Sequence, residues 1–376
     1  LELFKGAFDD SIGTKTKPEN KPYIGYSLTD GKLAYTVVPK LQPDNEIWYT
    51  TVDGSIANFN DNYCNTTLIS NTYKNGLGVA KFKDPLIKIW GDMESKREGE
   101  HFEVSYWGFA GGTRIETIFL PNKLETIDAY AFNYHYVGFP TRESADVEYL
   151  REITLGNNIN TLDYSPNYGN SLQKTIYKGD VSDYCKINII SSPVSYSHNL
   201  YINDVLLTDL IVPDDIFELK PMVFKSCESL NSLTLHKNVQ TIGTSAFEGC
   251  TGLTAITIPE SVTYIGESAF AACYSLTEFV FPDSVVCIGD SAFSGCRSLN
   301  NVVWPREITQ IGEGMFSSCW GLTEITIPEG VTVIGRGAFS GCNTLTEIQF
   351  PESLRSVGRG AFSGCHVLNE IEWSSN

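Results

Sequence analysis

One period constrains the fold of this chain more than any other feature of its sequence. Leucine recurs every 23 residues through the C-terminal half, at Leu230, Leu253, Leu276, Leu299, Leu322, Leu345 and Leu368. The six intervals share the pattern L-x-x-φ-x-φ-P-x-x-φ-x-x-φ-G-x-x-A-F-x-x-C-x-x, where φ is apolar and single positions vary. A period of roughly 20 to 50 residues is typical of a solenoid, in which each repeat forms one coil that stacks on the next.

The copy at residues 253–273 shows how one coil is expected to fold. Ile256 and Ile258 alternate with polar residues and precede Pro259, which predicts a short strand that ends at the proline. A second apolar segment ends at Gly266, where glycine indicates either a positive φ or a close approach of two backbones. The following Ala-Phe-x-x-Cys segment is expected to fill the core from a single helical turn. Stacked coils then place equivalent strands in parallel, about 4.8 Å apart.

The ten cysteines do not form a metal-binding or disulfide pattern. Seven of them repeat one structural position, at Cys227, Cys250, Cys273, Cys296, Cys319, Cys342 and Cys365. Side chains in successive coils point the same way, with Cβ atoms near the strand spacing, which is wider than the roughly 3.5–4.5 Å of a disulfide. We therefore expect reduced, buried cysteines that act as small apolar side chains.

The chain before residue 207 follows the repeat less well. Residues 1–76 are predicted to be a β-rich N-terminal cap, with a hairpin turning at Asp30-Gly31 and a strand that ends before Asp53. Degenerate repeats follow over residues 77–206, with a second hairpin around Asn203-Asp204, and regular repeats occupy residues 207–376.

Composition excludes several classes of partner. Acidic residues outnumber basic ones by 45 to 27, so the net charge is −18, which argues against nucleic acids and anionic membranes. The sequence contains no apolar run long enough for a membrane-spanning helix, and no signal peptide is recognisable. None of the five histidines stands in a metal-binding spacing, and no acid, base and nucleophile converge. We expect a monomeric protein without enzymatic activity, cofactor or metal.

The repeats resemble the BspA-type leucine-rich repeats, also called the Treponema pallidum type. Residues 262–270 (VTYIGESAF) and 331–339 (VTVIGRGAF) are close to that family's pattern, and residues 198–204 resemble an insert common in it. The resemblance is strong over residues 207–373, fair over 77–206 and weak before that. It implies an α/β solenoid, a right-handed leucine-rich repeat superhelix of 23-residue repeats with parallel β-strands and a small β-rich N-terminal cap. It also implies a bacterial or protist protein that is secreted or on the cell surface and acts in adhesion or protein binding. No catalytic residue carries over from it.

Strand residues that face away from the core are the candidate binding residues. The apolar ones are Phe119, Ile176, Ile211, Val280 and Val303, and the acidic ones are Glu278, Glu324, Glu347 and Glu370. We expect Phe119, Ile176 and Ile211 to form an exposed patch that points to a binding surface. The alternative is that these positions reflect only β-propensity and solubility.

Two classes of ligand fit a row of outward-facing strand residues of this kind. Mixed apolar and charged positions favour an extracellular protein as the partner. The alternative is a glycan bound for nutrient capture, which the tyrosines of the irregular loops would support, namely Tyr134, Tyr136, Tyr164 and Tyr168.

Overall fold

The computed structural model describes residues 23–29, 32–38, 42–98, 101–108, 115–128, 131–132, 149–164 and 171–373. The chain divides into two compact units, Leu1–Pro43 and Asp44–Asn376. In the first unit, β1 (Tyr23–Thr29) and β2 (Lys32–Val38) form an antiparallel hairpin in which Thr29 pairs with Lys32. This pairing confirms the hairpin that the Asp-Gly signal predicts.

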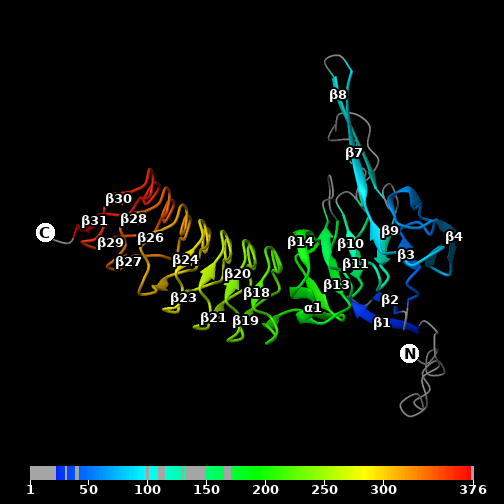
Figure 1. Ribbon diagram of the computed structural model, residues 1–376, viewed down its shortest axis with the longest axis horizontal. Helices are drawn as coiled ribbons and strands as arrows, with labels where there is room; N and C mark the ends of the chain where they lie inside the picture. Colours follow the sequence, from blue (N-terminus) through cyan, green and yellow to red (C-terminus); the bar gives the residue numbers. More distant parts are fainter. Residues whose placement is uncertain are drawn as a thin grey trace, which may run out of the picture. The chain divides into compact units, whose positions relative to one another are not determined.

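The second unit is a solenoid of short parallel strands, as the 23-residue period predicts. Each coil contributes a front strand, which follows the repeated leucine, and most coils also contribute a shorter back strand, which precedes the repeated glycine (Figure 1). The front strands are β9 (Ile115–Phe119), β11 (Glu152–Leu155), β13 (Lys174–Tyr177), β15 (Leu200–Ile202), β17 (Asp209–Ile211), β19 (Ser232–Thr234), β21 (Ala255–Thr257), β23 (Glu278–Val280), β25 (Asn301–Val303), β27 (Glu324–Thr326), β29 (Glu347–Phe350) and β31 (Glu370–Trp373). The back strands are β6 (Lys88–Ile89), β10 (Thr126–Ile127), β12 (Thr161–Asp163), β14 (Asn188–Ser191), β18 (Glu218–Leu219), β20 (Thr241–Ile242), β22 (Tyr264–Ile265), β24 (Cys287–Ile288), β26 (Gln310–Ile311), β28 (Val333–Ile334) and β30 (Ser356–Val357).

The repeated glycine lets one coil pack closely against the previous one. A Cβ added at Gly266 would lie 2.6 Å from the main-chain nitrogen of Thr244, and its φ lies outside the left-handed region. The same close approach occurs at Gly243, Gly289, Gly335 and Gly358. Of the two roles that the sequence left open for this glycine, close backbone approach is therefore the correct one.

The segment after the glycine is a series of turns, so the predicted helical turn is wrong. Ser268 and Ala272 adopt left-handed backbone angles, with φ of 54° and 57°. Alternate N–H groups in this segment donate to the next coil: Ser268 to Asp290, Phe270 to Ala292 and Ala272 to Ser294, at 2.7–2.9 Å between nitrogen and oxygen. A helix would direct all of these N–H groups along its own axis, whereas the turns direct half of them to the neighbouring coil.

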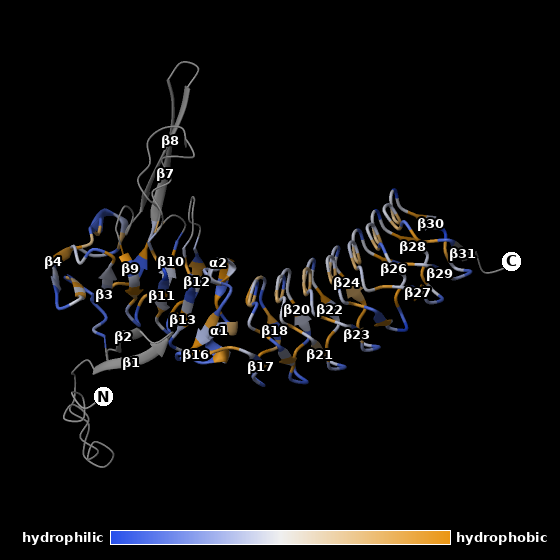
Figure 2. Ribbon diagram, turned by 180° about the vertical axis from the view of Figure 1, so that it is seen from behind, coloured by the Kyte–Doolittle hydropathy of each residue, from blue (hydrophilic) through white to orange (hydrophobic). Residues whose placement is uncertain are grey.

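Two ladders of side chains run through the core. The phenylalanine rings at Phe224, Phe247, Phe270, Phe293, Phe316, Phe339 and Phe362 stack with centroids 5.4–5.6 Å apart. Beside them the seven repeated cysteines are all reduced, and all are buried except the half-buried Cys365. Figure 2 shows apolar residues recurring in every coil.

The cysteines do more than fill space. The thiol of Cys296 donates a hydrogen bond to the main-chain oxygen of Phe270, with 3.2 Å between sulfur and oxygen, and the pattern repeats along the ladder at 3.2–3.3 Å. Burial raises the pKa of Cys296 to about 12 and the pKa of Cys227 to about 11. The thiols of Cys227 and Cys296 are therefore protonated at neutral pH.

A small β-rich cap covers the first front strand, as predicted. Its strands β3 (Glu46–Thr51), β4 (Leu68–Lys74) and β5 (Leu77–Phe82) are antiparallel, and β3 pairs with β9. The division of the chain at residue 76 stays a prediction. The other elements are the 3-10 helix η3 (Asp61–Tyr63), the hairpin of β7 (Gly91–Glu98) and β8 (His101–Gly108), the helices α1 (Val181–Cys185) and α2 (Val194–Ser197), and β16 (Val205–Leu206). Strand β16 pairs with β15 across Asn203 and Asp204, which confirms the second predicted hairpin.

Candidate functional site

The outward surface of the front strands, here called the strand face, is open from β17 to β29. Ile211, Val280 and Val303 are 72%, 50% and 45% exposed. Glu278 and Glu324 are also exposed, and Glu347 is half-buried. The side chain of Glu370 lies outside the described part of the structure.

The prediction of an exposed apolar patch at the N-terminal end of the strand face is wrong for two of its three residues. Phe119 is only 8% exposed, because Trp48 of the cap strand β3 pairs directly with it. Ile176 is only 2% exposed, and in the sheet it stands between Thr154 and Tyr201 on the neighbouring strands. Only Ile211 of this set is on open surface.

The loop tyrosines that kept a glycan ligand under consideration lend it little support. Tyr164 is 2% exposed and packs edge-on against Tyr196, with ring centroids 5.7 Å apart. Tyr134, Tyr136 and Tyr168 lie outside the described residues.

The strand face opens into a pocket between β25 and β27. In most coils the front strands are hydrogen-bonded neighbours, but β21 is not paired with β23, and β25 is not paired with β27. The second of these two breaks is the one that holds a pocket. In the continuously described stretch from 171 to 373, no main-chain bond joins Thr323 N to Asn300 O, although Thr346 N donates to Thr323 O at 2.8 Å. The gap holds a pocket of about 430 Å³.

The pocket lies where one coil, residues 299–321, departs from the repeat. Asn301 stands where its neighbours have Glu, Val302 replaces the larger Phe or Ile, and Trp304 replaces Ile or Phe. These three residues line the pocket together with Asn300 and Val303. The sequence signal for this coil is the comparison of the repeat copies at each position, since the general pattern alone does not distinguish it.

Trp304 replaces a main-chain hydrogen bond between β25 and β27 with one from its side chain. In some coils the residue at its position uses its main-chain N–H to bond the next coil, as Phe281 N does with Val303 O and Ile327 N with Gln349 O, both at 2.9 Å. Trp304 instead donates its indole Nε1–H to the oxygen of Thr326, at 3.0 Å. The indole thus occupies the acceptor that the main chain uses in those coils.

The back strands separate at the same coil. Met315 takes the place of the repeated alanine and is fully buried. Gly335 N donates to Ile311 O of the previous coil. In the described stretch 171–373, the equivalent bond from Gly312 N to Ile288 O is absent, and β24 is not paired with β26. The extra volume of methionine accounts for this second separation.

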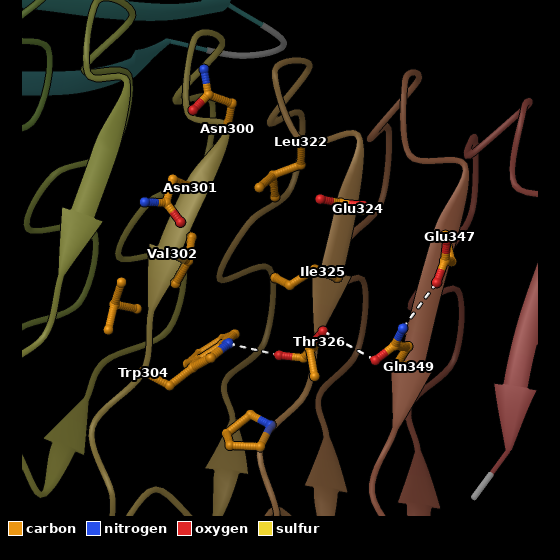
Figure 3. A pocket seen from close by; sticks show the side chains of 12 residues that line it. Asn300, Asn301, Val302, Trp304, Leu322, Glu324, Ile325, Thr326, Glu347 and Gln349 are labelled. Carbon is orange, nitrogen blue, oxygen red and sulfur yellow. Dashed lines mark hydrogen bonds between the residues drawn. The ribbon is translucent and has the colours of Figure 1, made fainter.

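A chain of polar contacts orders one wall of the pocket (Figure 3). Thr326 Oγ1 donates to Gln349 Oε1 at 3.3 Å, and Gln349 Nε2 donates to Glu347 Oε1 at 3.0 Å. These bonds use both ends of the Gln349 amide and fix its orientation. The Glu347 carboxylate keeps its remaining lone pairs for another donor.

The pocket is acidic, and no basic side chain of the described residues pairs with its carboxylates. Glu324 and Glu347 stand directly opposite each other on β27 and β29, and no lysine or arginine lines the pocket. Across the described stretch 171–373, no basic nitrogen lies within 4.0 Å of either carboxylate, whereas Asp283 and Glu313 each have an arginine partner. Figure 3 shows the Glu324 side chain pointing from β27 toward β25.

An aromatic column precedes the same strands. The guanidinium of Arg297 lies 4.3 Å from the ring centroid of Tyr274 and 4.4 Å from that of Trp320. Tyr274 and Trp320 are about two-fifths exposed. The three residues are equivalent in successive coils, so this stack follows directly from the repeat.

In the ranges that the structure describes, no group of three or more His, Cys, Asp or Glu side chains is placed to hold a metal ion. No helix in those ranges has both the length and the apolar composition of a membrane span.

Comparison with known families identifies the repeat. The family described as BspA type leucine-rich repeat region matches residues 100–140, 194–323 and 265–376, in six copies. The chain belongs to the BspA-type leucine-rich repeat family. As a member of this family with an open strand face, this BspA-type protein is a repeat-based module suited to binding.

Solved structures similar to this BspA-type protein are leucine-rich repeat proteins of bacteria. A leucine-rich repeat protein of T. pallidum shares 37% identity with a TM-score of 0.42, over 44% of this chain and 79% of that chain. A leucine-rich cell surface protein of Faecalibacterium prausnitzii shares 21% identity with a TM-score of 0.32, over 75% and 95% of the two chains. A leucine-rich repeat protein of Eubacterium ventriosum shares 13% identity with a TM-score of 0.40, over 76% and 98%. No curated protein matches the chain.

Proposed function

We propose that this BspA-type protein is a non-enzymatic binding module, secreted or on the cell surface, whose strand face binds an extracellular protein. The observation that carries the proposal is the pocket between β25 and β27, where the front strands are not hydrogen-bonded to each other and the strand face is hollowed. Exposed Val280 and Val303 stand on the strands before it, and the carboxylates of Glu324 and Glu347 stand after it. A surface that combines exposed apolar side chains with charge and a central pocket has the features of a protein interface.

A glycan is the second candidate because Tyr274 and Trp320 expose aromatic rings near the same strands. Sugars stack on the open face of an aromatic ring. Here the guanidinium of Arg297 covers one face of each ring, at 4.3 and 4.4 Å from the centroids. The column is therefore less accessible to sugar than two open rings would be, and a protein ligand is favoured.

The test is a parallel screen of the chain against arrays of purified extracellular proteins and of glycans. We expect saturable binding to protein, and we expect Val303→Lys on the strand face to weaken it about tenfold or more, as the loss of a central contact does. The matched control is Val286→Lys, because Val286 is 72% exposed and stands next to the back strand β24. Binding only to glycans, or protein binding that is equally sensitive to both variants, would contradict the proposal.

A further inference from the structure

We infer that the pocket between β25 and β27 receives an arginine side chain of the protein partner. This inference rests on the proposed binding function of the strand face and specifies the chemistry of its central contact. Three observations support it: the size and lining of the pocket, its uncompensated charge, and the main-chain groups that the separated strands leave open.

The pocket has the size and lining to hold one long side chain. Its volume of about 430 Å³ lies within the range of small-ligand sites, roughly 300–1,000 Å³. The apolar residues that line it are Val302, Val303, Trp304, Leu322, Ile325 and Pro328. An arginine side chain has a three-carbon stem that packs on apolar surface, and a charged end that remains at the polar rim.

The charge of the pocket selects a cation. Glu324 and Glu347 contribute two carboxylates at equivalent positions of adjacent strands, without a lysine or arginine within 4.0 Å in the described stretch 171–373. Elsewhere in the same solenoid, paired charges are common at the equivalent spacing of one coil, as with Lys225 and Glu248 at 2.8 Å. The partner can supply the cation that this chain does not.

The arrangement of acceptors favours guanidinium over ammonium. A guanidinium presents five N–H donors in a plane and pairs bidentately with carboxylates, whereas a lysine ammonium is a compact charge with three donors. The carboxylates of Glu324 and Glu347 and the unbonded main-chain oxygen of Asn300 offer acceptors on both sides of the gap. Trp304 adds an aromatic ring to the lining, with one face stacked on Phe281 at 6.2 Å between ring centroids. Guanidinium packs on such a ring more readily than ammonium.

The test uses Nα-acetyl-L-arginine amide as the probe and the Trp304 indole N–H as the reporter. In a ¹⁵N-tryptophan NMR titration of the full chain, we expect this signal to shift and saturate, with Trp304→Phe identifying it. The neutral citrulline counterpart has nearly the same shape and should bind about tenfold more weakly or worse, because a charged hydrogen-bonded pair contributes more than a neutral one. Equal binding of citrulline, or equal binding of Nα-acetyl-L-lysine amide, would overturn the inference.

A matched set of variants locates the contact. Glu324→Gln combined with Glu347→Gln should weaken arginine binding about tenfold and leave the urea midpoint equal or slightly higher, since it removes two like charges that face each other. Glu278→Gln is the control, because Glu278 occupies the same position of its strand but does not line the pocket. If Glu278→Gln weakens binding as much as the double variant, the probe is responding to the general negative charge of the strand face, and the inference is wrong.

The outcomes separate this inference from the proposed function. If the arginine probe fails to bind while Val303→Lys still abolishes binding to a protein, the strand face is an interface but its pocket takes another group. If the probe binds and depends on Glu324 and Glu347, but no protein binding depends on Val303, the pocket chemistry is correct and the proposed function is wrong. Association with a protein partner should also slow in the double variant at low salt, where exposed charges are screened least.

Discussion

The stacked phenylalanines give the sharpest test of how this solenoid is held together. Phe293 is fully buried between Phe270 and Phe316, with ring centroids 5.6 Å away on each side. It also contacts Phe279 edge-on at 4.4 Å and Phe281 at 5.4 Å. Truncating a buried phenylalanine to alanine costs about 3–5 kcal/mol. Four ring contacts, each worth about 0.5–1.5 kcal/mol, place Phe293→Ala at the upper end of that range.

Two controls make this prediction refutable in urea melts followed by circular dichroism. Phe362 is half-buried and contacts Phe339 at 5.4 Å and Phe350 at 5.9 Å, so Phe362→Ala should cost about half as much. Thr326 is exposed on the strand face, and Thr326→Ala should stay within about 0.5 kcal/mol of the unchanged protein. If Phe293→Ala and Thr326→Ala lower the urea midpoint equally, the inward and outward positions have been assigned incorrectly.

Four further predictions use the same melts or a thiol titration. Gly266→Ala should lower the free energy of unfolding more than Gly312→Ala. The new Cβ at position 266 would lie 2.6 Å from backbone atoms, whereas the one at position 312 would have only the flexible Asp290 carboxylate within 3 Å. Equal losses of stability in the two variants would contradict close coil packing. The exposed Cys287 should react with a thiol reagent in the native protein and Cys296 only after unfolding. Burial raises the pKa of Cys296 to about 12, so above about pH 8.5 this thiol begins to ionise in the unfolded chain but not in the folded one. The free energy of unfolding should therefore fall as the pH rises above that value. A free energy of unfolding that stays constant up to about pH 11 would count against this prediction. Ala272→Gly should raise the free energy of unfolding by about 0.5–1 kcal/mol, because Ala272 holds a φ of 57° that glycine adopts without strain, and a loss of stability would refute this.

The coil architecture could be predicted because its cause is local and repeated. The strand that ends at Pro259 and the glycine at Gly266 recur at one interval, so a correct prediction for one repeat applies to every coil. The helical turn was predicted wrongly for a non-local reason: the N–H groups of Ser268 and Phe270 bond to the following coil, and a single repeat gives no indication of that partner.

The exposure of the candidate binding residues could not be predicted with the same success. Facing away from the core is a property of the strand, whereas exposure depends on what else covers that face. Phe119 faces outward and is nevertheless buried, because the cap strand places Trp48 opposite it. Val280 and Val303 have no such neighbour and are exposed as expected. Whether any of these residues contacts a ligand stays a prediction.

The departures of one coil from the repeat are better explained by binding than by stability. Separating β25 from β27 forgoes main-chain hydrogen bonds worth about 0.5–1.5 kcal/mol each, and facing Glu324 with Glu347 adds a repulsion of a few tenths of a kcal/mol. Phe in place of Trp304 is compatible with the main-chain bond, as Phe281 N to Val303 O shows, and Thr in place of Glu324 would remove the repulsion. Natural sequences break their own local rules mainly at functional sites. The separated strands, the indole that donates to Thr326 and the two carboxylates without a basic partner in the described stretch 171–373 occur at the same place, and one arginine side chain entering from a partner would contact all three.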